Sequence, residues 1–266
     1  MPAARSVLGW ASGPSGHVFL WELVASVALF LSFWPAMTWL SVAGSKSQTW
    51  HGQYWPWLWH AGGMVVFDMA LPGTWVNPSL VVGSWVVGAI KTKEAQLRVA
   101  AELIAALFAW RLMKDWVGLP GWLSSHPGMS GPAVSQPLKT ADAALYECLL
   151  TTVLSIVLTL VGNFFAQAAM LRRVLTAIVV RVLIQVGGRL GTGGCMNSLV
   201  SLAWIFYSPS LALNKSSNLL DYQLIYVLSP VVGAVAGSVT VDLALQVAKS
   251  LATVGGTKSS NSKKRR

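Results

Sequence analysis

The sequence predicts an all-α membrane protein with six transmembrane helices and two re-entrant half-helices in an inverted repeat, and three observations lead to this fold class. Of the 266 residues, 54% are hydrophobic and 11% are charged, and the mean hydropathy is +0.58. Such a chain is too apolar and too sparsely charged for an ordinary soluble domain. Its apolar residues also gather in blocks of about the length that crosses a bilayer. Finally, its two halves repeat the same order of elements.

The excess of basic residues suggests a nucleic-acid-binding protein, but the pattern of charges along the chain argues against that class. The formal net charge is +10, with a pI of about 10.0. Nucleic-acid-binding proteins present their basic residues on one folded face, whereas here these residues lie between long apolar blocks. We therefore expect membrane lipid, and no nucleic acid, as a partner.

The residues that carry enzyme chemistry are sparse and scattered. The two cysteines, Cys148 and Cys195, form neither a disulfide framework nor a zinc-ligand spacing. The four histidines are far apart in the chain, and no cluster of His, Ser and acid is visible in the sequence. We therefore expect no catalytic residue, no metal and no cofactor, so the chain is not expected to be an enzyme.

Six apolar stretches are candidates for membrane spans, some of them short. A helix that crosses the bilayer needs about 20 mostly apolar residues. The first stretch is too long, and too free of a small-residue cleavage site, for a signal peptide. Charged residues, Gly, Pro or Asn bound each of the later stretches. The six stretches cover residues 18–42, 54–71, 97–112, 143–166, 174–186 and 222–247.

Two shorter apolar segments, 77–90 and 197–207, are predicted to be re-entrant half-helices. Each follows a glycine-containing turn and begins with an asparagine, which is among the best N-cap residues. Pro78 follows Asn77 at the first helical position, where proline is favoured. Irregular backbone at membrane depth survives only where it is buried in protein or lines a watery cavity. The pair therefore indicates a pore or a transporter.

The two halves of the chain match in order and spacing. Glu22 and Glu147, each an acid inside a span, are 125 residues apart, and Asn77 and Asn197 are 120 apart. Three spans per half is an odd number, so the second copy must enter the membrane from the opposite face. The predicted parts are a first repeat, a second repeat and a basic cytosolic tail, covering residues 1–138, 139–252 and 253–266.

At this point the motifs resemble those of the aquaporin (major intrinsic protein) family, from about Glu22 to Ala244. The segment 192–197 is similar to the family's Thr-Gly-x-x-Met-Asn, and 101–106 parallels its Ala-Gln-Leu-Leu-Gly-Ala. Two triplets resemble its Asn-Pro-Ala signatures: Asn77, Pro78 and Ser79, and then Asn197, Ser198 and Leu199. The resemblance implies a homotetramer of passive pores, in which the helix dipoles repel cations and each signature asparagine caps its half-helix and donates to passing water.

The resemblance also implies the roles of further residues. Glu22 and Glu147 are expected to support the signature loops by accepting hydrogen bonds from backbone N–H groups. Four positions are expected to form the outer selectivity constriction: Trp57, Gln185, Gly194 and Val200. Trp55, Trp57 and Trp59 lie close together in the sequence, so an aromatic belt at the membrane interface is the alternative for Trp57.

Two departures from the family pattern point to an unorthodox branch. Val200 stands where orthodox members have arginine, and Ser198 stands where they have proline. Drifted signatures and a basic tail resemble the small basic intrinsic proteins of plants and the superaquaporins, which are associated with the endoplasmic reticulum. Lys263 and Lys264 fit a dilysine retrieval signal; a solvated tail or an anionic-lipid patch is the alternative.

The function expected from these motifs is passive conduction of water, or of a small neutral solute, across an internal membrane. The alternatives are a facilitator for glycerol, hydrogen peroxide or ammonia, and a poorly conducting structural membrane protein. The plasma membrane or another organelle remains open as the location. Arg181 lies four residues before Gln185 on the same helical face. Arg181 either projects into the pore, or extends its side chain to the cytosolic side of the membrane, or pairs with an acid such as Glu102.

Overall fold

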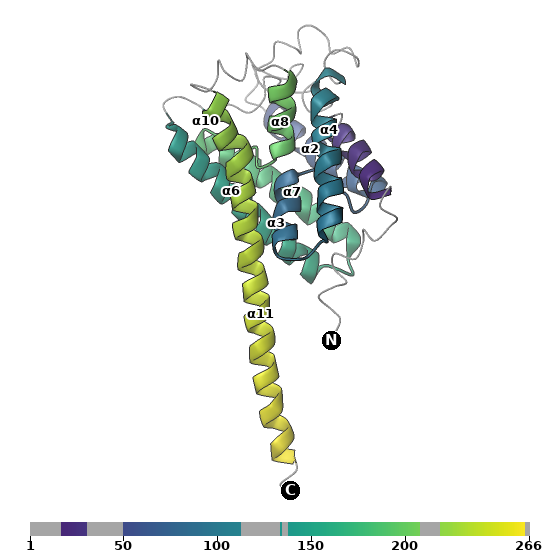
Figure 1. Cartoon of the computed structure of the whole chain (residues 1–266), viewed down its shortest axis with the longest axis vertical. Helices are drawn as coiled ribbons and strands as arrows, with labels where there is room; N and C mark the ends of the chain where they lie inside the picture. Colours follow the sequence, from purple (N-terminus) through teal and green to yellow (C-terminus); the bar gives the residue numbers. More distant parts are fainter. Residues whose placement is uncertain (1–16, 31–49, 113–133, 135–137, 208–218, 264–266) are drawn as a thin grey trace.

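The structure is a computed structural model that describes residues 17–30, 50–112, 134, 138–207 and 219–263. Within these ranges, the side chains of residues 50–57, 59, 110, 207 and 253–263 lie outside the description. The described residues form helices and turns and contain no strand (Figure 1). In chain order the helices are His17–Phe30, α2 (Trp50–Ala70), α3 (Pro78–Val86), α4 (Thr92–Arg111), α6 (Thr140–Phe164), α7 (Ala169–Leu190), α8 (Ser198–Tyr207), α10 (Leu219–Gln223), the π-helical turn η5 (Leu224–Leu228) and α11 (Ser229–Lys263).

Two of these helices are long and apolar enough to cross a membrane by length and composition. They cover Thr140–Phe164 and Leu219–Ala252, while His17–Phe30 is a shorter apolar helix. The helix α4 is less apolar because it carries Lys93, Glu94, Arg98 and Glu102. Hydropathy therefore identifies fewer spans here than the block pattern of the sequence does, since polar residues buried inside a bundle lower the hydropathy of their helix.

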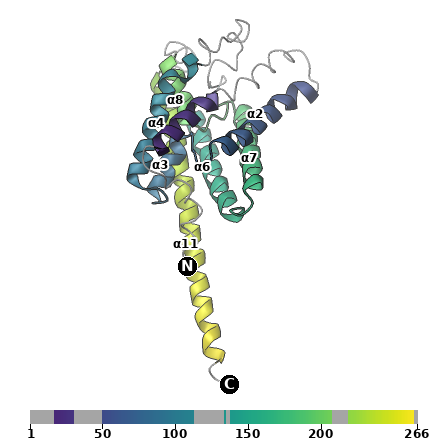
Figure 2. The ribbon, with the colours of Figure 1, turned by 90° about the vertical axis from the view of Figure 1, so that its right-hand side faces the viewer.

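The two short helices link the first half of the chain to the second. The helix α3 packs against α11 as well as α4, and α8 packs against α4 as well as η5. The helices α2 and α7 also lie against each other (Figure 2). Each short helix is therefore held by elements from both halves.

Glycines permit the closest helix contacts. A Cβ on Gly233 would lie 2.2 Å from the carbonyl oxygen of Cys148, and one on Gly237 would lie 2.6 Å from that of Thr152. Likewise, a Cβ on Gly83 would lie 2.7 Å from the carbonyl oxygen of Ala234. Gly233 and Gly237, four residues apart, therefore allow α11 and α6 to pack closely.

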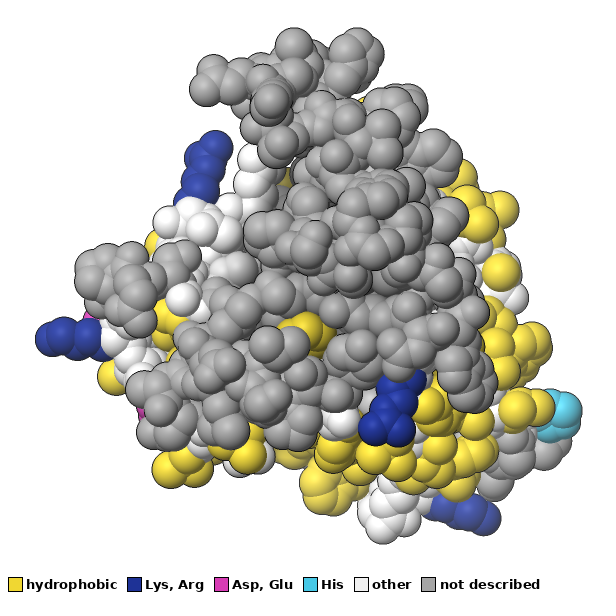
Figure 3. Space-filling view, turned by 90° about the horizontal axis from the view of Figure 1, so that it is seen from above, with side chains coloured by type: hydrophobic (Ala, Val, Ile, Leu, Met, Phe, Trp, Pro, Cys, Tyr) yellow, Lys and Arg dark blue, Asp and Glu magenta, His cyan; other side chains and the backbone are white. Residues whose placement is uncertain are grey.

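The main apolar cluster lies around α8, and large apolar side chains also cover much of the outside. Trp204, Tyr222 and Tyr226 are fully buried there with Phe30 and Leu199. Seen from above, hydrophobic side chains occupy much of the rim of the molecule (Figure 3). Charged groups such as Glu22 and Glu147, by contrast, are buried. This distribution, apolar outside and charged within, is typical of a protein whose solvent is lipid.

Two helix ends differ from the expected bounds. The first half-helix, expected over 77–90, ends at Val86, because Gly88 adopts a positive φ of 70° and its N–H bonds to the carbonyl of Trp85 at 2.9 Å. The last helix is longer than the expected span, 222–247. It continues as α11 to Lys263 and extends well beyond the body of the molecule (Figure 1).

Candidate functional site

The two signature asparagines cap their helices and bind each other's loops. The Oδ1 atom of Asn77 accepts a hydrogen bond from the N–H of Ser79 at 3.1 Å, and that of Asn197 accepts from Leu199 at 2.9 Å. The Nδ2 group of Asn77 donates to the carbonyl of Met196 at 2.9 Å. In the same way, Asn197 donates to the carbonyl of Val76 at 2.8 Å. Each amide has two N–H groups. One N–H of each asparagine is therefore not used in these crossed hydrogen bonds.

The first turns of α3 and α8 also touch. The hydroxyl oxygens of Ser79 and Ser198 lie 2.7 Å apart, and both side chains are buried. The N-termini of the two half-helices therefore meet. Since each N-terminus carries about half a positive charge, the meeting point is electropositive.

The residue before each asparagine has an unusual backbone conformation. Val76 and Met196 both have a φ of 47°, in the left-handed region that glycine favours. They are the non-glycine residues with positive φ in the part of the chain that the structure describes. For a β-branched residue such as Val76 this conformation is strained, so the surrounding structure must hold it in place.

Two buried carboxylates hold these strained residues. One oxygen of Glu22 accepts hydrogen bonds from the N–H groups of Trp75 at 2.8 Å and Val76 at 2.7 Å. The two oxygens of Glu147 accept from Cys195 at 3.1 Å and Met196 at 2.8 Å. Hydrogen bonds to a charged acceptor are shorter and stronger than neutral ones. Each carboxylate thus ties a signature loop to a neighbouring helix.

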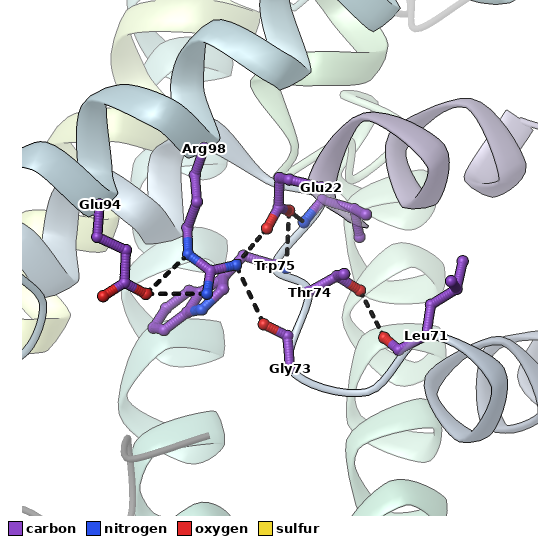
Figure 4. Close-up of polar contacts among 8 residues, drawn as sticks. Glu22, Leu71, Gly73, Thr74, Trp75, Glu94 and Arg98 are labelled. Carbon is purple, nitrogen blue, oxygen red and sulfur yellow. Dashed lines mark hydrogen bonds and ion pairs between the residues drawn. The ribbon is translucent and has the colours of Figure 1, made fainter. Parts of the chain in front are cut away.

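Arg98 is a functional-site residue that the sequence analysis missed. Its guanidinium pairs with Glu22, donates to the carbonyl of Gly73 at 3.0 Å and forms a second ion pair with Glu94 at 2.9 Å (Figure 4). It therefore joins the first helix, the loop before Asn77 and α4. The spacing of Glu94 and Arg98, four residues apart on one helix, was the available signal.

Glu102, which the sequence analysis names only as a possible partner of Arg181, lies inside the helix bundle. Its side chain is fully buried, and its carboxyl group lies beside Glu22 and Arg98. The signal was in the motif, because Glu102 stands where the family pattern has glutamine. Asp68, on α2, has 39% of its side chain exposed and pairs with Arg173 at 2.8 Å.

The second loop has supports of a different kind. The hydroxyl of Tyr226 donates to the carbonyl of Thr192 at 2.9 Å. The Sγ of Cys195 lies 3.3 Å from the carbonyl oxygen of Asn197 and 3.2 Å from the hydroxyl of Ser201. A phenol and a thiol therefore contact the second loop, whereas the guanidinium of Arg98 contacts the first.

The contacts of the described side chains do not join the four expected constriction residues into one group. Gly194 has a φ of +61° and lies against Ile184 of α7, where a Cβ would be 2.9 Å from the Ile184 Cα. Val200 is partly buried against the cluster around α8, and Gln185 is exposed on α7. Trp57 lies in α2, and its side chain is outside the description. The constriction stays a prediction.

Arg181 contacts a residue that the sequence analysis had not paired with it. One terminal nitrogen of Arg181 lies 3.2 Å from Nδ1 of His60 on α2, rather than beside Glu102. Of the expected retrieval signal, Lys263 ends α11, while its side chain and the whole of Lys264 lie outside the described residues.

The fold and the paired half-helices define an all-α membrane channel. The family model of the major intrinsic protein matches residues 15–240, and the chain belongs to this family. Its fold is similar to that in the X-ray structure of the aquaglyceroporin from Plasmodium falciparum, with a TM-score of 0.68 and 17% sequence identity over 86% of this chain and 96% of that chain. No curated protein matches the chain. Family membership supports a channel for water or small solutes, and not an enzyme.

Proposed function

We propose that the protein is a passive channel for water or small neutral solutes, built from six spans and two half-helices. The observation that carries this proposal is the crossed pair of Asn77 and Asn197 at the meeting point of α3 and α8. The electropositive helix N-termini repel cations at this point. A water that accepts a hydrogen bond from the remaining N–H of an asparagine must turn its own hydrogens outward, which interrupts proton relay.

A second candidate, conduction of a neutral solute other than water such as glycerol, hydrogen peroxide or ammonia, is favoured by Val200. Orthodox members carry arginine at this position, and valine removes both a fork of donors and a positive charge. The proposed constriction then consists of Trp57, Gln185, Gly194 and Val200. A filter without a fixed charge at its outer ring discriminates less against solutes larger than water.

The proposed assembly is a homotetramer in an internal membrane, with the endoplasmic reticulum favoured. The repeats are proposed to span 1–138 and 139–252, followed by the basic cytosolic tail, 253–266. Exposed leucines and valines on several helices support contact with lipid and with neighbouring subunits. The proposed tetramer rests on family resemblance. The proposed location rests on that resemblance and on Lys263 and Lys264.

Stopped-flow light scattering on proteoliposomes tests the proposal. We would compare osmotic shrinkage in sucrose, which stays outside, with shrinkage in glycerol. Asn77→Ser and Asn197→Ser retain an oxygen that can cap the half-helix but remove the cross-loop amide. We expect each variant to lower water flux about tenfold or more, as the loss of a positioned hydrogen-bonding pair predicts.

Asn163→Ser is the matched control, because among the described residues the Asn163 amide bonds within α6, to the carbonyl of Thr159 at 2.9 Å. It should leave the flux unchanged. Circular dichroism and size-exclusion chromatography establish that each variant is folded. If the folded parent protein conducts neither water nor glycerol above empty liposomes, the channel proposal is wrong and a structural membrane protein becomes the better interpretation.

A further inference from the structure

Arg181 is a charged residue at the middle of a helix that the proposed function does not use. It lies near the centre of α7 (Ala169–Leu190), and its contact, His60, lies near the centre of α2 (Trp50–Ala70). A charged group at this depth in a membrane protein is costly and faces the protein interior or a water-filled space. The question is therefore what the remaining donors of Arg181 meet.

Arg181 lies at the border of the exposed apolar side of α7. Ile178, Val182 and Val186 are 39%, 46% and 39% exposed, and they follow one another at helical spacing along one side. Successive residues of a helix point about 100° apart, so Arg181, which is partly buried, points away from its neighbour Val182. Gln185 lies one turn along the helix from Arg181 and is exposed.

The contact with His60 uses only part of the donor capacity of Arg181. A guanidinium has five N–H groups and no acceptor, so Nδ1 of His60 must be the acceptor of the 3.2 Å contact. The Nε of Arg181 is buried and has no hydrogen-bond partner among the residues that the structure describes. Because a buried donor without a partner is costly, this N–H, which no described residue satisfies, is expected to meet water or a solute.

We propose that Arg181, oriented by His60, lines the conducting path and is a specificity-determining residue of the channel. It provides hydrogen-bond donors to water or to a solute with acceptor oxygens. It also places a fixed positive charge on α7. In the family pattern, that charge lies instead at the position of Val200. The proposal rests on the proposed function, since it requires a conducting path.

Cysteine accessibility tests the placement without requiring conduction. Arg181→Cys and Val182→Cys would each be made in a Cys148→Ala, Cys195→Ser background and treated in proteoliposomes with methyl methanethiosulfonate, a small neutral reagent. Thiolate forms only where water reaches the sulfur. We expect Arg181→Cys to be modified about tenfold faster or more than the lipid-facing Val182→Cys, as measured by intact mass. Equally slow modification of both would overturn the placement.

Charge exclusion tests the role. Arg181→Met retains a long side chain without charge, and Arg181→Lys retains the charge. Because a unit charge a few ångströms from the path opposes a passing cation strongly, we expect Arg181→Met to raise the ratio of potassium flux to water flux about tenfold or more, while Arg181→Lys leaves it near the parent value. Arg189→Met removes the same charge from an exposed position on α7 and should change nothing.

The outcomes separate the two proposals. If Arg181→Met is folded and its flux ratio equals that of the parent, the specificity role is wrong even when water is conducted. If the parent conducts neither water nor glycerol, the proposed function fails, and the labelling rates still decide whether Arg181 faces water.

Discussion

At the scale of single residues, each signature loop depends on one carboxylate that holds one strained peptide. Val76 and Met196 have positive φ, which costs on the order of 1–3 kcal/mol each. Hydrogen bonds to a charged group contribute about 1.5–3 kcal/mol each. Two such bonds to the carboxylate of Glu22, and two to that of Glu147, are enough to offset the strain. The buried acids therefore act on the pore through the backbone.

The first loop should be sensitive to the loss of Arg98. Arg98→Leu leaves the buried carboxylate of Glu22 without its cation, and breaking a buried ion pair in this way costs about 3–5 kcal/mol. We expect a clearly lowered melting temperature in detergent. The double variant Glu22→Gln, Arg98→Leu should recover part of the loss, because the amide is neutral and still accepts from the loop.

Arg173→Leu is the control for this experiment, since it breaks the partly exposed pair with Asp68. Exposed pairs contribute about 0–1 kcal/mol. If Arg98→Leu and Arg173→Leu lower the stability equally, the proposed support of the first loop by Arg98 is wrong.

Two of the three drifted signature positions, Ser79 and Ser198, compensate each other. Ser79 and Ser198 stand where the family pattern has alanine and proline, and their hydroxyls bond to one another. Ser79→Ala or Ser198→Ala alone leaves one buried hydroxyl without this partner, which costs about 1–3 kcal/mol. We expect the double variant to cost less than the sum, with a coupling of about 1 kcal/mol in chemical unfolding. Strictly additive losses would contradict a direct bond.

At the scale of elements, close packing sets where the second loop can lie. The helix α7 ends at Gly191, which has a φ of 87°, and the chain turns back against the helix. The carbonyl of Gly187 accepts hydrogen bonds from the N–H groups of Thr192 at 3.0 Å and Gly193 at 3.1 Å. A Cβ on Gly187 would lie 2.2 Å from the Cα of Gly194. The loop therefore touches the helix backbone where only glycine fits.

Two neighbouring glycines provide a matched test of this contact. Gly187→Ala forces the loop away from α7, and overpacking of this kind costs about 1–3 kcal/mol. Nothing lies within 4 Å of a Cβ on Gly188, so Gly188→Ala should be neutral or stabilise the helix by up to about 1 kcal/mol. Thermal unfolding and water flux would be measured for both variants. Equal behaviour of the two would show that the contact does not position the loop.

At the scale of the whole molecule, the last helix continues far past the body. The helix α11 runs for 35 residues, or about 52 Å at 1.5 Å per residue, which exceeds a bilayer core of about 30 Å. Its end must therefore extend into water if the helix crosses the membrane. This places Lys263 well clear of the membrane surface, where a receptor can reach a signal.

The proposed retrieval signal can be tested in cells. We expect Lys263→Ala, Lys264→Ala to move a fluorescently tagged protein, labelled at its N-terminus, from the endoplasmic reticulum to the cell surface. Lys249→Ala, Lys258→Ala removes the same charge elsewhere on the helix and should leave the location unchanged. If both double variants relocate, basic charge and not a dilysine signal retains the protein.

Much of the architecture could be predicted from sequence, because it depends on local properties. Asparagine at 77 and 197 predicts a helix start through its own capping chemistry, and the helices do begin at the next residue. The end of the first half-helix was misplaced, because apolar residues continue to Ile90 while the chain turns at Gly88. The burial of Glu102 was not predicted, because charged residues are rarely fully buried and the available signal was its place in the family motif.

The sequence by itself determined the class of protein, the order of the helices, the two half-helices and the acids that precede them, since hydropathy, capping and repeat spacing are written in neighbouring residues. Only the tertiary structure decided the pairing of Arg98 with Glu22, of Ser79 with Ser198 and of Arg181 with His60, which are separated by 76, 119 and 121 residues. Such contacts depend on how distant helices pack together, within the first half for Arg98 and Glu22 and across the two halves for the other two pairs, and no local pattern encodes that arrangement.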